Sequence, residues 1–190
     1  MIHAFIFNRM QGLFSFHGGD EGPWKIVSMK AIIGESLKEV DRISIRSEAL
    51  DAPVDGYWRL RGVVSNERYV THQEREALRS IQPPLGRPSA TWAALIPIRK
   101  SGAWWSLAQD ERRAILEERS RHIELGMKYL PAVARKLHHC RDLGEPFDFL
   151  TWFEFASEDS GSFDDLLGLL RASEEWNYVE REVDIRLIRL

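Results

Sequence analysis

His122 is the histidine whose neighbours best suit a ligand-binding role. If the surrounding segment forms one helix, a turn of about 100° per residue puts His122 on the same face as Ala114, Ile115, Leu125 and Gly126. An imidazole on such an apolar face either makes one hydrogen bond inside a core or binds a metal ion or prosthetic group. The residue pattern leaves both interpretations open.

Arg135 follows thirteen positions after His122, among Leu130, Val133 and Leu137, in a segment that we expect to be a short helix. An unpaired guanidinium is costly to bury, so a buried Arg135 would need an anion. The alternative is an arginine whose stem packs on apolar neighbours while its charged head reaches solvent.

Two acidic residues, Glu174 and Glu175, fall where a predicted helix ends. The partial negative charge of the last carbonyl groups makes acidic side chains unfavourable there. Residues that break a local rule are expected at functional sites, although a solvated helix end explains the same pattern.

Cations and large rings come together where Arg99 and Lys100 are followed by Trp104 and Trp105. This combination suits a flat aromatic ligand that carries carboxylates, and haem is such a ligand. A basic turn beside two core or interface tryptophans fits the spacing equally well.

The run His138, His139 and Cys140 resembles a set of metal ligands. In the helix expected there, adjacent side chains point about 100° apart and cannot all reach one ion, so we do not predict a zinc site. The sequence also has no dinucleotide-binding glycine motif, P-loop, nucleophile elbow or H-E-x-x-H motif.

Composition narrows the class of protein. The chain has 190 residues, 44% of them hydrophobic, which is enough for a sizeable core. The net charge of -3 gives no field that would attract nucleic acid or anionic lipid, and charges interrupt every hydrophobic stretch, so we expect neither a nucleic-acid nor a membrane partner. A single cysteine and an N-terminus without a basic segment or small-residue cleavage site favour a cytoplasmic location.

The order of predicted elements indicates an α+β fold. Alternating apolar residues predict strands over 24–33, 43–46, 147–155 and 178–188, and the apolar run over 92–98 predicts a buried strand. Residues 57–64 are a further strand candidate. Capping boxes at Thr71 with Glu74 and at Ser106 with Gln109 predict a helix over 72–80 and a long helix that reaches Gly126. Further helices are expected over 131–140 and 162–174. This order fits two ferredoxin-like halves, 1–100 and 101–190, with a surface insert over 48–56.

Several longer stretches resemble a known family, the short-chain chlorite dismutases. They are WRLRGVVSNERYVT (58–71), IQPPLGRPSATWAALIPIRKSGAWW (81–105), DERRAILEERSRHIELGMKYLPAVARKLHHCRDLGEPFDFLTWFE (110–154) and EEWNYVEREVDIRL (174–187). The resemblance implies a dimeric α+β barrel, a homodimer, and one haem b in the C-terminal half of each chain.

The resemblance also implies a role for each candidate residue. His122 would be the axial iron ligand and Arg135 the catalytic residue on the distal side, where the substrate chlorite would bind. The implied proximal network consists of Lys100 and a glutamate, for which we choose Glu175 over Glu174. The remaining implied contacts are Trp104 and Trp105 beside the haem, Gln82 on the distal side, and Asn66 and Tyr69 near the propionates.

Other functions remain open on the sequence alone. A coproporphyrin-haem decarboxylase would use the same scaffold, but those enzymes do not share an arginine at the distal position. A haem-binding or haem-sensing module would need only the axial histidine. A haem-free structural oligomer would need neither residue.

Overall fold

Strands from both ends of the chain close into one barrel in the computed structural model, which describes residues 12–47, 56–65 and 70–190. The eight strands of the described residues pair antiparallel in the order β1-β3-β2-β8-β5-β7-β6-β4, and β4 pairs with β1 to close the ring. The strands are β1 (Leu13–Gly19), β2 (Trp24–Ile33), β3 (Arg42–Ser47), β4 (Trp58–Val64), β5 (Trp92–Lys100), β6 (Ala134–His139), β7 (Phe149–Phe155) and β8 (Val179–Arg189).

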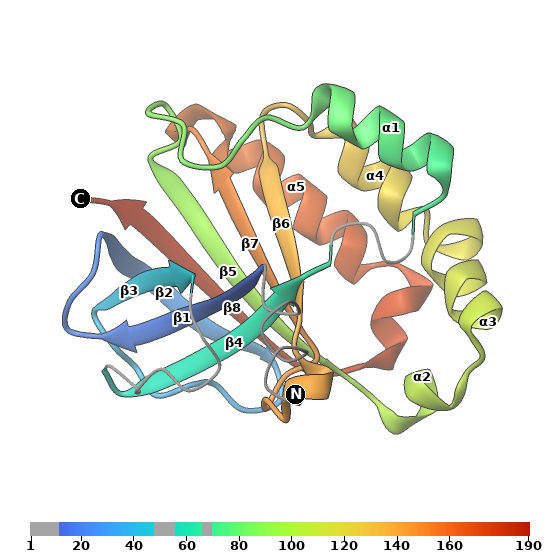
Figure 1. Cartoon of the computed structure of the whole chain (residues 1–190), viewed down its shortest axis with the longest axis horizontal. Coiled ribbons are helices and arrows are strands. Elements are labelled where there is room, and N and C mark those ends of the chain that lie inside the picture. Colours follow the sequence, from blue (N-terminus) through green and yellow to red (C-terminus); the bar gives the residue numbers. More distant parts are fainter. Residues whose placement is uncertain (1–11, 48–55, 66–69) are drawn as a thin grey trace, which may run out of the picture.

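The helices gather on one side of the barrel, over the strands of the second half, while β1 to β4 lie on the other side (Figure 1). They are α1 (His72–Ile81), α2 (Gly102–Ser106), α3 (Gln109–Arg113), a π-helical turn (Ala114–Arg119), α4 (His122–Lys128) and α5 (Ser160–Arg171). Short 3-10 turns cover Arg141–Leu143, Ser157–Asp159 and Glu174–Tyr178.

The sheet of the second half is buried on both faces. On β7, Leu150 and Trp152 point into the barrel core, whereas Phe153 and Phe155 point toward α5 and pack against Phe163. Alternation along a strand sends successive side chains to opposite faces, so an apolar strand can serve two cores at once. Both faces of β7 are therefore apolar.

Most predicted elements are confirmed. The strands expected over 24–33, 43–46, 57–64, 92–98, 147–155 and 178–188 are present as β2, β3, β4, β5, β7 and β8 with small shifts at their ends. The helix after Thr71 is α1, and its capping box is formed: Thr71 Oγ1 accepts from the Glu74 amide and the Glu74 carboxylate accepts from the Thr71 amide. The strand β1 was not predicted.

The helix expected over 131–140 was wrong, because this segment contains strand β6. Residues such as Ala, Leu, Lys and Arg favour helices, but β6 pairs with β7 along its whole length, from Ala134 opposite Glu154 to His139 opposite Phe149. Tertiary pairing overrides the weak local preference, and Arg135 therefore projects from a strand.

The single long helix ending at Gly126 was also wrong. It is divided into α3, the π-helical turn and α4, and the break comes at Arg121, whose φ of 51° is left-handed. Ser106 does not cap α3, because its hydroxyl donates to the Gly102 carbonyl. The residue that precedes α3 is Ala108, whose amide donates to the Glu111 carboxylate. Ala114 and Ile115 therefore do not share a helical face with His122.

The helix expected over 162–174 begins earlier and ends at Arg171. Glu174 and Glu175 open a separate 3-10 turn, and Ser173 precedes it. The acidic pair consequently does not oppose the dipole of a helix end.

The element order of the second half is β5, helices α2 to α4, β6, β7, α5 and β8, with the sheet order β8-β5-β7-β6. Strand β5 lies before residue 100 but pairs with β7 and β8. The sheet itself does not divide at residue 100, and the division into two halves stays a prediction.

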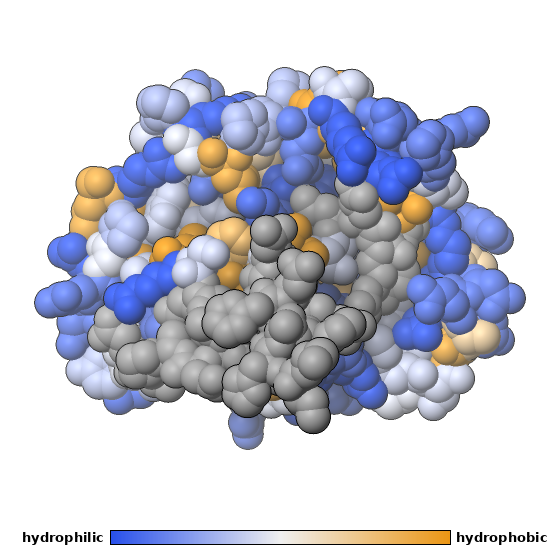
Figure 2. Space-filling model, viewed as in Figure 1, coloured by the Kyte–Doolittle hydropathy of each residue, from blue (hydrophilic) through white to orange (hydrophobic). Residues whose placement is uncertain are grey.

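No helix of the described residues is both long and apolar enough to cross a membrane. On the face drawn in Figure 2, apolar side chains form small separate patches among hydrophilic ones.

His138 gives a testable consequence of this packing. Its ring contacts Phe14 and Phe16 edge-on and its Nδ1 donates to the Leu150 carbonyl at 3.1 Å. Burial lowers the pKa of His138 from its usual 6.5 to about 4. The unfolded chain therefore binds a proton at His138 at a higher pH than the folded chain does. The stability that the neutral, buried His138 contributes is complete above pH 6.5 and is lost as the pH falls toward 4.

We expect the free energy of unfolding of the wild type to fall between pH 7 and pH 4 by about 3 kcal/mol more than that of His138→Gln. Urea unfolding of both proteins across this pH range measures the difference. Equal pH dependence in the two proteins would contradict the assignment of a neutral, buried His138.

Candidate active site

A pocket lies between the helix-covered face of the sheet and helices α4 and α5. It encloses about 1140 Å³ of space that protein atoms do not fill, including its open mouth. Its walls are mostly apolar and include Ile96, Phe153 and Leu166. Few charged groups reach it, so each of them stands in a setting where electrostatic interactions are strong.

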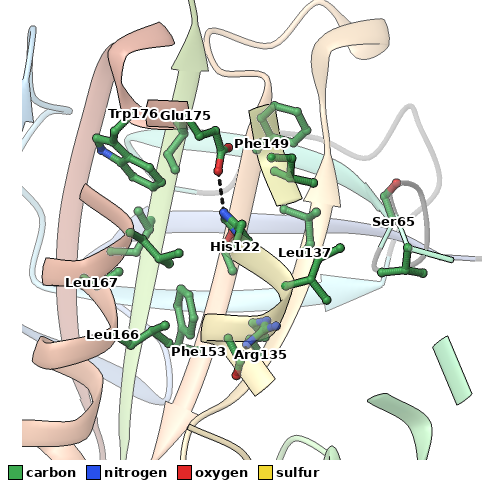
Figure 3. A pocket seen from close by; sticks show the side chains of 18 of the residues that line it. Ser65, His122, Arg135, Leu137, Phe149, Phe153, Leu166, Leu167, Glu175 and Trp176 are labelled. Carbon is green, nitrogen blue, oxygen red and sulfur yellow. Dashed lines mark hydrogen bonds and ion pairs between the residues drawn. The ribbon is translucent and has the colours of Figure 1, made fainter. Parts of the chain in front are cut away.

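Three of these polar groups form a chain of contacts. His122 Nδ1 lies 2.6 Å from Glu175 Oε2 (Figure 3). Lys100 Nζ donates to Glu175 Oε1 at 2.8 Å. The Lys100 and Glu175 side chains are only 2% and 6% exposed. Glu174 instead forms an exposed ion pair with Arg119, so of the two glutamates it is Glu175 that the structure brings to His122.

The backbone also fixes Glu175. Its amide donates to Ser120 Oγ at 2.9 Å, and its carbonyl accepts from Lys100 Nζ at 3.2 Å. Ser120 ends the π-helical turn just before the break at Arg121. The break thus presents both Ser120 and His122 to the 3-10 turn that carries Glu175.

Glu117 caps the helix that begins with His122. Arg121 offers no side-chain cap, but the Glu117 carboxylate accepts from the Ile123 amide at 2.7 Å and the Glu124 amide at 3.3 Å. These amides lack partners within the helix, and a carboxylate satisfies both their hydrogen-bonding capacity and the positive end of the dipole. Glu117 therefore holds the first turn of α4, and His122 with it.

Charge keeps Glu175 ionised. Burial alone would raise its pKa, but His122 and the Lys100 ammonium lower the pKa of Glu175 to about 2. An ionised carboxylate only accepts hydrogen bonds, so His122 Nδ1 carries the proton that lies between them. In the neutral imidazole, Nε2 then keeps its lone pair and can act as a ligand.

Indole rings surround Lys100 on its other sides. Its ammonium lies 4.8 Å from the ring centroid of Trp104 and 5.3 Å from that of Trp176. Trp176 is itself fixed, because its Nε1 donates to the buried Glu182 at 2.8 Å. The ammonium is thereby held by a carboxylate, a carbonyl and two aromatic faces.

Arg135 lines the same pocket from β6. Its Nη1 donates to the Gly126 carbonyl at 2.7 Å, and in the described part of the chain it has no carboxylate partner. Burial lowers the pKa of Arg135 to about 10, so the guanidinium is still charged at neutral pH. In the view of Figure 3, His122 lies between Glu175 and Arg135. The site can therefore attract an anion.

The other sequence candidates fall into three groups. Trp104 and Gln82 line the pocket, the latter at the end of α1. Trp105 does not line it: its ring stacks on Phe149, a lining residue, and its Nε1 donates to Asp148. Asn66 and Tyr69 lie outside the described residues.

Sequence reasoning missed four residues that position the site: Glu117, Ser120, Asp148 and Glu182. Each acts through a backbone group or through another side chain, as Asp148 does in accepting from the Lys100 amide at 2.7 Å. Asp148 and Glu182 are buried acidic residues, which are uncommon, but their burial follows from the fold and not from neighbouring residues in the sequence.

His138, His139 and Cys140 do not come together around an ion. They lie at the end of β6, where His138 faces the barrel core and His139 contacts Trp105 and Phe149. Burial raises the pKa of the Cys140 thiol. Among residues 12–47, 56–65 and 70–190, no group of three His, Cys, Asp or Glu residues could hold a metal ion.

Comparisons with known proteins agree on one family. A family model described as Chlorite dismutase matches residues 27–189. A crystal structure of dimeric chlorite dismutases from Nitrobacter winogradskyi is 59% identical, covers 93% of this chain and 99% of that chain, and has a TM-score of 0.87.

Two more distant relatives extend the comparison. The chlorite dismutase of Ideonella dechloratans is 36% identical over 76 residues, which span 40% of this chain but only 25% of that protein. A mutant chlorite dismutase from Candidatus Nitrospira defluvii is 18% identical, covers 94% of this chain and 91% of that chain, and has a TM-score of 0.66, which shows the fold alone.

The buried ion pair between Lys100 and Glu175 should contribute to the free energy of unfolding. Lys100→Met leaves Glu175 without its ammonium partner, and breaking a buried pair costs about 3 to 5 kcal/mol of unfolding free energy. The adjacent Arg99→Met removes an exposed ion pair with Glu180 and should cost less than about 1 kcal/mol.

Denaturant unfolding of the two variants and of Lys100→Met with Glu175→Gln tests this expectation. The double variant should recover much of the loss, because it no longer buries an unpaired charge. Equal losses for Lys100→Met and Arg99→Met would show that the pair does not stabilise the site.

Proposed function

Because the chain belongs to the chlorite dismutase family, we propose that it is a haem b enzyme that converts chlorite to chloride and dioxygen. The observation that carries the proposal is one apolar pocket that contains both a carboxylate-held imidazole and a buried arginine for which the described residues offer no carboxylate partner. The first suits an iron ligand and the second suits an anionic substrate.

The residues present fit a haem group. The pocket is largely apolar, as a porphyrin requires, and the contact of His122 with Glu175 uses Nδ1, so that Nε2 can serve as the iron ligand. Trp104 lines this pocket, and its indole N–H is buried without a hydrogen-bond partner among the residues that the structure describes. Such an orphaned donor is rare in a folded protein and is suited to a propionate.

On the proximal side, we assign the iron-ligand role to His122 and the supporting roles to Glu175 and Lys100. A carboxylate that accepts from Nδ1 fixes the tautomer and increases the electron donation of the other nitrogen. Lys100 keeps that carboxylate ionised and in place. Held in this way, His122 would be a strong electron donor to the iron of a bound haem.

On the distal side, Arg135 binds the anion. A guanidinium in an apolar pocket offers a full charge and directed donors, and one Arg135 donor already bonds to Gly126. The remaining donors can orient chlorite and retain a chlorine-containing anion until the reaction is complete. Gln82 also lines this pocket and can donate or accept a hydrogen bond there.

The net reaction needs no second reactant. In ClO2⁻ → Cl⁻ + O2 both chlorine–oxygen bonds break and one oxygen–oxygen bond forms, while chlorine gains the electrons that the two oxygens lose. Bound haem supplies this redox chemistry, and the protein supplies the ligand, the charge and the enclosed pocket.

Several finer features belong to the same proposal. The barrel consists of two ferredoxin-like halves, and two chains form a homodimer, as the Nitrobacter winogradskyi protein is described as dimeric. The protein acts in the cytoplasm, where a single buried cysteine stays reduced. It uses neither nucleic acid nor a membrane as a partner.

An oxygen electrode tests the proposal directly. Haem-loaded protein should release dioxygen promptly after chlorite is added. A coproporphyrin-haem decarboxylase would instead remove carboxyl groups from coprohaem, a haem sensor would bind haem without either reaction, and a haem-free oligomer would stay colourless. Any of these three outcomes without oxygen release would overturn the proposal.

His122→Ala tests the iron ligand. Without an imidazole the iron lacks its protein ligand, so the Soret band should shift and oxygen release should be lost. Absorption spectra and oxygen traces measure both, with the exposed His72→Ala as control. An unchanged Soret band and full activity in His122→Ala would remove the assignment.

Arg135→Ala tests retention of the reacting anion. The variant should still bind haem, but hypochlorite, the anion that remains when chlorite has lost one oxygen, should escape, oxidise the protein and bleach the haem after fewer turnovers. Met127, which follows Gly126 in the chain, and Tyr129 are the candidate targets. Bleaching and hypochlorite trapping during turnover measure this loss. The same turnover number and the same leakage as in wild type would contradict the role.

A further inference from the structure

Gly126 occupies a position in α4 where glycine is unfavourable for the helix. Its φ is not in the left-handed region, so the backbone conformation there does not require glycine. Glycine in a helix is destabilising relative to alanine because it loses more conformational freedom on folding. The reason for Gly126 must therefore lie in the space beside it.

That space is filled by Arg135. A Cβ atom added at Gly126 would lie 2.3 Å from Arg135 Nη2, 2.4 Å from Nη1 and 2.5 Å from Cζ. These distances are far inside van der Waals contact, so any side chain at position 126 would force the guanidinium to move. Glycine is what lets the guanidinium lie against the helix backbone.

The Gly126 carbonyl is also available as an acceptor. It belongs to the last turn of α4, where carbonyl groups lack the donors of a following turn. The amide of Leu130, four residues later, donates to the Met127 carbonyl instead. Arg135 Nη1 donates to the Gly126 carbonyl at 2.7 Å, and a cation at this end of a helix is favoured by the helix dipole.

We propose that Gly126 is a positioning residue for Arg135: its missing side chain and its carbonyl together set where the guanidinium stands in the pocket. Gly126 lies one helical turn after His122, so α4 also determines the position of the Arg135 charge that receives the anion. This inference rests on the proposed function for its role in anion binding, but the contact itself can be tested without haem.

A double-mutant cycle with Gly126→Ala and Arg135→Ala tests the contact in the haem-free protein. In the Arg135→Ala background the space is vacated, so Gly126→Ala should raise the melting temperature by about 2–4 °C through helix propensity. In the wild-type background the same substitution should not raise it, because alanine displaces the guanidinium. Gly168→Ala is the matched control, since Gly168 is a helical glycine in α5 with open space around it, and it should raise the melting temperature in both backgrounds.

The wild type, Gly126→Ala, Arg135→Ala and the double variant are then loaded with haem to measure anion binding. Azide is the probe, and the shift of the Soret band reports its affinity. Gly126→Ala should weaken azide binding about tenfold when Arg135 is present, as expected for a displaced charge-assisted hydrogen bond, and should change it less than about twofold when Arg135 is absent. Gly168→Ala should leave azide binding unchanged.

Additive effects would overturn the proposal. If Gly126→Ala changes the melting temperature and the azide affinity equally in both backgrounds, position 126 acts through general packing and not through Arg135. Failure of the proposed function gives a different result: the cycle in the haem-free protein would still show coupling, while chlorite would release no oxygen from the haem-loaded wild type.

Discussion

The site depends on a carboxylate that is buried and nevertheless charged. Glu175 accepts hydrogen bonds from Lys100 and His122 in a pocket that is mostly apolar, and Lys100 cannot be removed without leaving an uncompensated charge on Glu175. Such a pair adds little stability compared with apolar side chains of the same size, so its presence is better explained by what it does to the imidazole. It determines which nitrogen of His122 carries the proton and leaves the other to face the pocket.

Three separate segments must meet for this contact to form. Strand β5 ends with Lys100, the 3-10 turn before β8 carries Glu175, and the break at Arg121 begins α4 with His122. Two residues precede the break: Ser120 accepts from the Glu175 amide, and Glu117 accepts from the first amides of α4. The irregular segment between α3 and α4 is consequently the part of the fold that brings the site together, and π-helical turns are frequent at functional sites.

The sequence predicted the elements whose signals are local. The capping box at Thr71, the apolar run over 92–98 and the alternation over 178–188 depend on neighbours within a few residues, and all three elements are present. Strand β6 and the break at Arg121 were not predicted, because the first follows from pairing with β7 and the second from contacts with the turn at Glu175. The candidate residues His122, Arg135 and Lys100 came from their chemistry and from a family resemblance, whereas Glu117 and Ser120 carry no local signal of their role.

If His122 binds haem iron through Nε2 while its Nδ1–H donates to Glu175, the iron–histidine stretching vibration responds to both contacts. We would measure it by resonance Raman spectroscopy of the reduced, haem-loaded wild type and of Glu175→Gln. A carboxylate partner makes the imidazole a stronger donor, so the band should be present in wild type and should move to lower frequency in Glu175→Gln. The same frequency in both proteins, or no iron–histidine band in the wild type, would contradict the claim.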